Sequence, residues 1–258
     1  MPELPEVEVM TRNLRRWLNG QELRLELVDP RLLKGEPPQD PQRVVQVHRR
    51  GKYSFIEREA DTWVLHFRMT GKVVPAREGG KVRARLLTDT GAYHFLDQRC
   101  LGELHVLPPG ASEAFEAGLN LGPEPYPQRQ SGAWWRERLS GLRGAIKPAL
   151  MRQDRVAGLG NIAASEICFR AGVDPRRPVP DVLAWDGIAT EAHAFLHEVV
   201  DLEGQGDEIQ YINSDPDARN PFAVYGRAGE PCLRCGEGIE RIVQSGRSSF
   251  YCPSCQEG

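Results

Sequence analysis

The sequence predicts an α+β protein, and three patterns along its 258 residues support this. Apolar residues near the start recur at helical spacing, residues 22–107 alternate with a period of two, and helical spacing returns after a segment rich in proline and glycine. We therefore expect an N-terminal helix with a β-sandwich or barrel, then a helical domain and a small cysteine-bearing unit. The expected boundaries are 1–112, a linker over 113–130, 131–221 and 222–258.

The first expected element is a helix over the stretch ELPEVEVMTRNLRRWLNG. Val7, Met10 and Leu14 recur at helical spacing. Pro5 suits a first helical turn, and Gly20 suits a C-terminal stop. A start made of two prolines and three carboxylates has little to pack, and it would by itself fray into solvent.

Short strands are expected next. Trp63, Leu65, Phe67 and Met69 alternate with other residues, so Met69 can be a core methionine on this face. The stretch RLLTDTGAYHFLD predicts a hairpin with a glycine at its turn. Several such strands indicate a sandwich or barrel.

Helical spacing returns in four segments, approximately 134–139, 144–153, 162–171 and 187–202. The turn VAGLGN separates two of them. Gly158 and Gly160 permit tight backbone there, and Asn161 suits the N-cap of the next helix. A glycine-rich turn before a helix can bind anions and grip a DNA backbone. A plain helical hairpin is the alternative.

Composition indicates a globular chain, with 40% apolar and 27% charged residues. The net charge of −3 does not favour nucleic acid, yet basic residues gather within 43–58 and 136–155. Two solvated faces would explain these patches equally well. No apolar run could span a membrane, and no signal peptide is visible. We expect a cytoplasmic protein, in which disulfides are rare.

The six cysteines therefore need another explanation. CLRC and CPSC lie sixteen residues apart, a spacing typical of a four-cysteine zinc site formed by Cys232, Cys235, Cys252 and Cys255. The alternative is two disulfides or four unrelated thiols. The stretch between the pairs predicts a hairpin with Ser245-Gly246-Arg247 at its tip. The remaining two cysteines, Cys100 and Cys168, are interpreted as ordinary thiols.

Taken together and in this order, the motifs resemble the formamidopyrimidine-DNA glycosylase and endonuclease VIII family of base-excision repair enzymes. The resemblance covers nearly the whole chain. It rests on PELPEVE, RRGKY, RMTGK, DQRCLG, LGPEP, IKPALMRQDRVAGLGNI and CLRC…GRSSFYCPSC. It implies an N-terminal helix plus β-sandwich, a helical domain with a helix–two-turn–helix motif, and a C-terminal zinc ribbon.

The resemblance also implies the catalytic residues. Removal of Met1 would expose the secondary amine of Pro2 as the nucleophile, which forms a Schiff base with the sugar. Glu3 would be the acid/base carboxylate, Glu6 a supporting carboxylate, and Lys52 a lysine facing the lesion phosphate and the reaction centre. A solvated helix start and a solvated strand-edge lysine are the alternatives for these residues.

DNA contacts are implied by the same resemblance. Met69, Arg99 and Leu101 match side chains that fill the hole left by a flipped base. The residues matching phosphate contacts are Lys147, Asn161 and Arg247. Glu166 matches a carboxylate of less direct role, or a structural charge.

Two stretches depart from the guanine-repair pattern. Asp-Gln-Arg-Cys-Leu-Gly replaces Asp-Pro-Arg-Arg-Phe-Gly at residues 97–102, which bears on opposite-base preference. The loop at 203–221 lacks the usual Gly-Gly-Ser run, although its length suits a lid.

We therefore expect a bifunctional DNA glycosylase and abasic-site lyase for oxidised purines such as 8-oxoguanine and formamidopyrimidines. Its cofactor would be structural Zn²⁺, and its partner double-stranded DNA with damaged bases or abasic sites. We expect a monomer without membrane contact, associated with the nucleoid in a bacterium. The alternatives are an endonuclease VIII-like preference for oxidised pyrimidines, or a non-catalytic damaged-DNA binder. A zinc-ribbon protein that binds other partners would leave the N-terminal motif unexplained.

Overall fold

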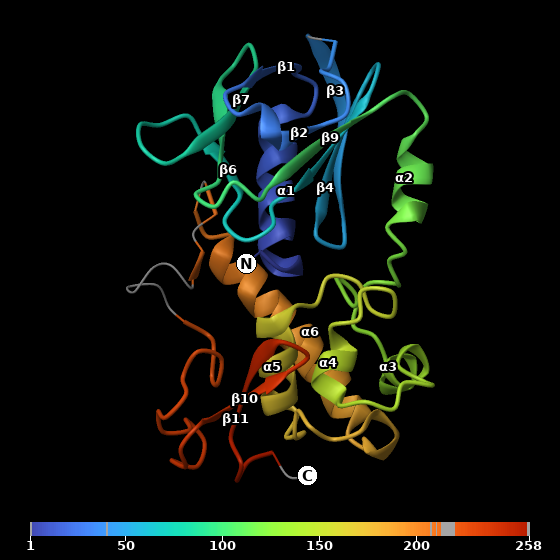
Figure 1. The fold of residues 1–258 in the computed structure, drawn as a ribbon, viewed down its shortest axis with the longest axis vertical. Helices are drawn as coiled ribbons and strands as arrows, with labels where there is room; N and C mark the ends of the chain where they lie inside the picture. The colour runs from blue at the N-terminus through green and yellow to red at the C-terminus, as the bar shows by residue number, and fades with distance from the viewer. Residues whose placement is uncertain (1, 40, 207, 210, 213–219, 257–258) are drawn as a thin grey trace. The chain divides into compact units, whose positions relative to one another are not determined.

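The computed structural model describes residues 2–39, 41–206, 208–209, 211–212 and 220–256. Contacts divide the chain into two compact units (Figure 1). Unit 1 comprises Met1–Leu119 and Val200–Ala218, and unit 2 comprises Asn120–Val199 and Arg219–Gly258. The domain boundaries expected at 112, 130 and 221 stay a prediction.

Helix α1 (Leu4–Leu18) forms the centre of unit 1, as its sequence predicts. Glu3 is its N-cap, and a proline occupies its first turn. Leu4, Val7, Leu14 and other apolar side chains of the helix are fully buried. Beyond the C-cap, Gly20 adopts a φ of 77°, a backbone conformation that glycine accommodates without strain.

A nine-stranded sheet surrounds α1, in the order β2-β9-β5-β4-β3-β1-β7-β8-β6. Neighbouring strands are antiparallel except β2 and β9. β1 pairs with β3 through its first residues and with β7 through its later ones, so it joins two halves of the sheet. Contacts of α1 with β3, β4 and β6 lie on both halves, which confirms the helix-plus-sandwich prediction (Figure 1). The strands are β1 Glu22–Leu27, β2 Leu33–Lys34, β3 Gln42–Arg50, β4 Tyr53–Arg58, β5 Thr62–His66, β6 Lys72–Pro75, β7 Val82–Leu87, β8 Ala92–Leu96 and β9 Glu103–Leu107.

The alternation expected along 63–69 differs from the structure. β5 ends at His66, and Val64 is as deeply buried as Trp63. The reason is helix α2 (Ser112–Gly118), which lies in the segment expected to be a linker. Its Phe115 ring packs 6.4 Å from Phe55, a residue paired with Val64 in the ladder. Both faces of the strand are therefore covered.

Unit 2 contains the four expected helices and the expected hairpin. Ser245 (φ 48°) and Gly246 (φ 74°) form the left-handed turn of that hairpin, whose formation confirms the ribbon prediction. The N-cap prediction for Asn161 is wrong: α5 begins at Asn161, and Gly160 occupies the cap position. The elements are α3 Gly132–Arg138, α4 Ile146–Leu150, α5 Asn161–Arg170, α6 Trp185–Glu203 (shared with unit 1), β10 Glu240–Gln244 and β11 Arg247–Tyr251. Two 3₁₀ turns, η1 Pro30–Leu32 and η2 Val179–Asp181, complete the secondary structure of the described residues.

Within the described part of the chain, no helix has the length and apolar character needed to cross a membrane.

A buried carboxyl group lies where α6 ends in unit 1. Glu203 is 3% exposed, and its Oε1 accepts a hydrogen bond of 2.9 Å from the Ile212 N–H. Its Oε2 is buried without a hydrogen-bond partner among the described residues. Burial raises the pKa of Glu203 to about 8, and the charge of Glu6 acts in the same direction. Glu203 therefore holds its proton at neutral pH.

Replacing Glu203 by Gln should stabilise the protein at alkaline pH and leave its stability nearly unchanged near pH ~5. Between the usual pKa of 4.5 and the folded value of about 8, the unfolded chain releases the proton while the folded chain keeps it. The free energy of unfolding of the parent therefore falls as pH rises through this window. A Gln side chain can still accept the hydrogen bond from the Ile212 N–H, but it has no proton to release in this pH range. We expect the melting temperature to rise by several degrees near pH ~8.5, at roughly 2–4 °C per kcal/mol.

Thermal melts across this pH range check the prediction, with the exposed Glu59→Gln as the control. A Glu203→Gln melting temperature that follows the parent at every pH would contradict it.

Candidate functional site

The first turn of α1 forms a reciprocal capping box. The Glu6 carboxylate accepts a 2.8 Å hydrogen bond from the Glu3 N–H, while the Glu3 carboxylate accepts one from the Glu6 N–H. Glu3 and Glu6 are 3% and 5% exposed, and Pro2 is also buried. The N-terminal motif is thus a folded, buried turn rather than a frayed end. Met1 lies outside the described residues.

The two carboxyl groups of this turn interact electrostatically. Burial and, to a smaller extent, the Glu3 charge raise the pKa of Glu6 to about 7. Near neutral pH, Glu6 is therefore protonated in an appreciable fraction of molecules. The turn places one group able to exchange a proton directly beside the start of the chain.

Two side chains from other parts of unit 1, Tyr211 and Lys72, lie near helix α1. The Tyr211 hydroxyl donates to the Gly71 carbonyl oxygen and lies 3.8 Å from the Met10 sulfur, one helical turn beyond Glu6. The Lys72 Nζ lies 5.7 Å from the centroid of the Tyr211 ring. Tyr211 belongs to the loop whose length suits a lid, in which residues 207, 210 and 213–219 lie outside the described residues. The composition of this loop does not predict that Tyr211 or Glu203 belongs to the site.

Lys52 lies in the turn that joins β3 and β4, directly before β4 begins. It is half-buried, and its charge acts on His66. Burial and, to a smaller extent, the charges of Arg68 and Lys52 lower the pKa of His66 to about 4. His66 is therefore neutral, and Lys52 is one of the cationic groups that act on it.

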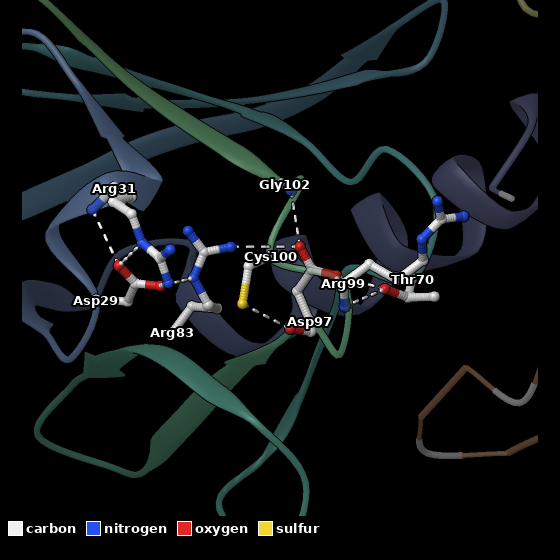
Figure 2. Close-up of polar contacts among 8 residues, drawn as sticks. All are labelled: Asp29, Arg31, Thr70, Arg83, Asp97, Arg99, Cys100 and Gly102. Atoms are coloured by element: carbon white, nitrogen blue, oxygen red, sulfur yellow. Dashed lines mark hydrogen bonds and ion pairs between the residues drawn. The ribbon is translucent and has the colours of Figure 1, made fainter.

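The predicted hole-filling residues lie on two loops that the structure brings together. Thr70, next to Met69, donates from its hydroxyl to the Asp97 carboxylate and accepts the Arg99 N–H at 3.1 Å (Figure 2). Arg99 is exposed, and Leu101 has 44% of its surface exposed. Met69 is half-buried and lies outside β5, so it is not a core methionine.

In unit 2, the predicted phosphate-contact residues lie together. The Lys147 ammonium donates to the Asn161 side-chain oxygen and, at 3.2 Å, to the Ser248 carbonyl oxygen. The Asn161 amide donates to the same carbonyl at 2.9 Å. Lys147 is fully buried, whereas Arg247, adjacent to Ser248, is exposed. Lys147 therefore lies behind this cluster and fixes Asn161 against the hairpin.

A pocket of about 470 Å³ lies against the same hairpin. Its lining includes the guanidinium-bearing residues Arg143, Arg152 and Arg247, together with Ser245. Three arginines around one hollow provide donors suited to an anionic backbone.

Glu166 has a structural position. It is fully buried in α5, and its carboxylate accepts hydrogen bonds of 2.8–3.0 Å from the N–H groups of Ala223, Val224 and Tyr225. It thus clamps the segment that leads into the cysteine unit. Burial raises its pKa, although these three hydrogen bonds act in the opposite direction.

The four clustered cysteines fit a tetrahedral metal. Their sulfur atoms all lie within 4.8 Å of one another, with separations of 3.4 Å for Cys235–Cys252 and 3.9 Å for Cys232–Cys255. Zn–S bonds of ~2.3 Å at tetrahedral angles place sulfur atoms ~3.8 Å apart. None of the six cysteines forms a disulfide, which excludes the two-disulfide alternative. The site is a structural Zn²⁺ site, packed on the Phe169 side of α5.

Three family models match the chain. The formamidopyrimidine-DNA glycosylase N-terminal domain matches residues 1–104, the formamidopyrimidine-DNA glycosylase H2TH domain matches 121–210, and the zinc finger found in FPG and IleRS matches 229–258.

Relatives and solved structures agree with these matches over the full chain. The formamidopyrimidine-DNA glycosylases of Paracoccus denitrificans and an Exiguobacterium species are 38% and 34% identical, and each alignment covers 100% of both chains. The MutM (FPG) protein of Thermus thermophilus is 33% identical with a TM-score of 0.84 and full coverage of both chains. The Lactococcus lactis protein, in complex with DNA containing FAPY-dG, is 27% identical with a TM-score of 0.86, over 99% of this chain and 100% of that one. The chain therefore belongs to the formamidopyrimidine-DNA glycosylase family.

Proposed function

We propose that this chain is a bifunctional DNA glycosylase and abasic-site lyase of base-excision repair, with oxidised purines as its principal substrates. The observation that carries this proposal is the buried first turn, in which Pro2 precedes the reciprocal Glu3–Glu6 capping box. Packing would explain burial of the proline ring alone. A secondary amine held beside a carboxylate, by contrast, is ready for nucleophilic catalysis.

The chemistry follows from these groups. Once Met1 is removed, the uncharged Pro2 nitrogen attacks the sugar C1′, and the bond from C1′ to the base breaks. The base leaves with the bonding electrons and takes up the proton that the Pro2 nitrogen loses. Glu3 donates a proton to the ring oxygen as the sugar opens, and the nitrogen becomes an iminium. This iminium has no N–H to lose, so it stays cationic and accepts electrons when the C2′ proton departs. Elimination then breaks the C3′–O bond and cleaves the strand.

Glu6 supports this sequence from the same turn. It holds the Glu3 backbone by a hydrogen bond, and its pKa of about 7 allows it to take or release a proton during turnover. Lys52, at the end of the β3–β4 hairpin, would face the lesion phosphate. Zn²⁺ held by the four clustered cysteines would give structure to the hairpin that carries Arg247.

DNA would be held by two groups of residues. We assign Asn161 and Arg247 to backbone phosphates, with Lys147 ordering Asn161 from behind, and this contact fixes register without reading sequence. Met69, Arg99 and Leu101 would occupy the space left by the flipped base, at the cost of a few kcal/mol of unstacking. For a bacterial chain we propose action at the nucleoid.

A preference for oxidised pyrimidines is the second candidate. It is favoured by the aliphatic Leu101 and by the composition of the 203–221 loop. The Lactococcus lactis protein has been solved with DNA containing an oxidised pyrimidine as well as with FAPY-dG. Single-turnover excision from duplexes that each carry one lesion decides between the two, and faster release of a pyrimidine lesion would reverse the assignment.

Pro2→Gly should bind DNA as the parent does, but cleave preformed abasic sites more slowly, on the order of 10²-fold. The new primary amine forms an imine that is neutral unless protonated, whereas the proline iminium is always cationic. Borohydride reduction of the parent on abasic DNA should give a covalent adduct, and peptide mapping should place it on Pro2. An adduct on a lysine, or no adduct from protein lacking Met1, would refute the nucleophile assignment. The second result would favour a non-catalytic binder.

Glu3→Gln should lose base excision by roughly 10²–10⁴-fold and retain part of the cleavage of preformed abasic sites. Those sites already present an open-chain aldehyde, so they need less acid assistance. Gln can still accept the capping hydrogen bond, which keeps the turn folded. Single-turnover rates on both substrates test this, and an equal loss on both would indicate a structural role for Glu3.

Arg247→Ala should weaken binding to damaged and undamaged duplexes by similar factors, because a phosphate carries no base identity. The slope of log affinity against log salt should decrease in magnitude by about 0.9, the contribution of one phosphate contact. Arg241→Ala, another exposed arginine on the same hairpin, is the matched control. If Arg247→Ala changed lesion choice and kept the parent salt slope, the hairpin would not be a backbone clamp.

A further inference from the structure

A fully buried arginine, Arg83, lies in strand β7 of unit 1. Arg83 occupies a β-bulge: Val82 pairs with Leu96 and Ala84 pairs with Phe95, so Arg83 is the extra residue between them. Its side chain is 1% exposed. The sequence VRARLL gives no sign of this, because an arginine in an alternating strand is expected to face solvent.

Two carboxylates hold the Arg83 guanidinium, one on each side (Figure 2). Nε forms an ion pair with Asp29 Oδ2 at 2.8 Å, without the geometry of a hydrogen bond, and Nη1 lies 3.4 Å from Oδ2 of the fully buried Asp97. Arg31 fixes Asp29 by hydrogen bonds of 2.8 and 2.9 Å. The result is a continuous row of alternating charges that ends at Asp97.

Asp97 in turn orders the loop that follows it. Its Oδ2 accepts the Gly102 N–H at 2.7 Å, and its Oδ1 accepts the Arg99 N–H at 3.2 Å and the Thr70 hydroxyl. Its backbone carbonyl accepts the Cys100 N–H at 3.3 Å, where the chain adopts a φ of 53°. One carboxylate therefore binds both ends of the exposed segment that contains Arg99 and Leu101.

The hydrogen bonds that Asp97 accepts from the loop depend on the positive charge of Arg83 as well as on side-chain packing. A buried carboxylate that loses its cationic partner takes up a proton or rotates toward water. Either change removes an acceptor from the Arg99 or Gly102 N–H group. A shift of about 1 Å in a supporting group is enough to displace the side chains that it positions.

We propose that Arg83 is a positioning residue for opposite-base recognition: through Asp97 it fixes the loop 97–102 and so the direction in which Arg99 and Leu101 are presented. This rests on the proposed function, in which Arg99 faces the orphaned base. Arg83 itself touches no DNA in this assignment. It acts only through Asp97.

The test compares Arg83→Met with Arg58→Met. Arg58 is a matched control, since it is also a buried arginine of unit 1, paired with Asp61 at 2.6 Å, but it contacts β1 and Trp63 rather than the 97–102 loop. Each variant is measured by thermal melting and by single-turnover excision of one lesion placed opposite each of the four bases. Both variants should melt at lower temperature. Only Arg83→Met should change the ratio of rates between the best and the worst opposite base, by roughly fivefold or more.

A double variant shows whether the effect passes through Asp97. If it does, Arg83→Met combined with Asp97→Asn should change the opposite-base ratio no more than Asp97→Asn alone. If Arg83→Met does not fold, Arg83→Lys and Arg58→Lys replace the pair, because lysine keeps the charge but cannot bridge two carboxylates with separate nitrogens.

An unchanged ratio in a folded Arg83 variant, or an equal change in the Arg58 variant, would overturn the proposal. Failure of the proposed function is distinguishable, because the parent would then neither excise a base nor form the borohydride adduct.

Discussion

Buried carboxylates that accept hydrogen bonds from backbone N–H groups hold the irregular segments on which the proposed site depends. Glu6 holds the start of α1, Asp97 the exposed loop, Glu203 the Ile212 backbone, and Glu166 the entry to the cysteine unit. Irregular backbone cannot satisfy its own N–H groups as a helix or sheet does, so each such segment needs an acceptor from elsewhere. A carboxylate offers several acceptor positions on one side chain and so can fix two or three successive residues.

The burial of these carboxylates has an electrostatic consequence. Burial raises the pKa of Glu6, Glu203 and Glu166, so these groups bind protons more tightly than a solvated carboxyl does. Asp97 has a cationic neighbour, because the Arg83 guanidinium lies beside it. In unit 1 the chain therefore contains both kinds of buried carboxyl: titrating ones close to the N-terminal turn and an ion-paired one in the 97–102 loop. The first kind suits proton exchange, and the second suits fixed geometry.

Much of this could be predicted from the sequence because the signals are local. Helix α1, the hairpin of β7 and β8 and the four-cysteine cluster each follow from spacing within a short window. The capping box is also local, since Glu3 and Glu6 are three residues apart. The order of the motifs along the chain identifies the family, because several weak patterns in a fixed order are far more specific than one.

What could not be predicted depends on contacts between distant residues. The segment of helix α2 has the composition of a linker because proline and glycine surround it, whereas its Phe115 packs on residues sixty positions earlier. Asn161 looks like a cap in isolation, but its side chain is recruited by Ser248. Tyr211 and Arg83 carry no local signal at all. Their positions depend on Gly71 and Asp97, which only the folded chain brings near them.

The bulge at Arg83 also bears on how this strand tolerates changes in length. Val82 and Ala84 face consecutive residues of β8, Leu96 and Phe95, so loss of the single codon for Arg83 would leave a regular ladder with no slip in register. Most deletions inside a strand turn its inward side chains outward and are eliminated by misfolding. This one would keep the pairing with β8, but it would remove the Arg83 carbonyl oxygen, which accepts the Val28 and Asp29 N–H groups, together with the cation that faces Asp97.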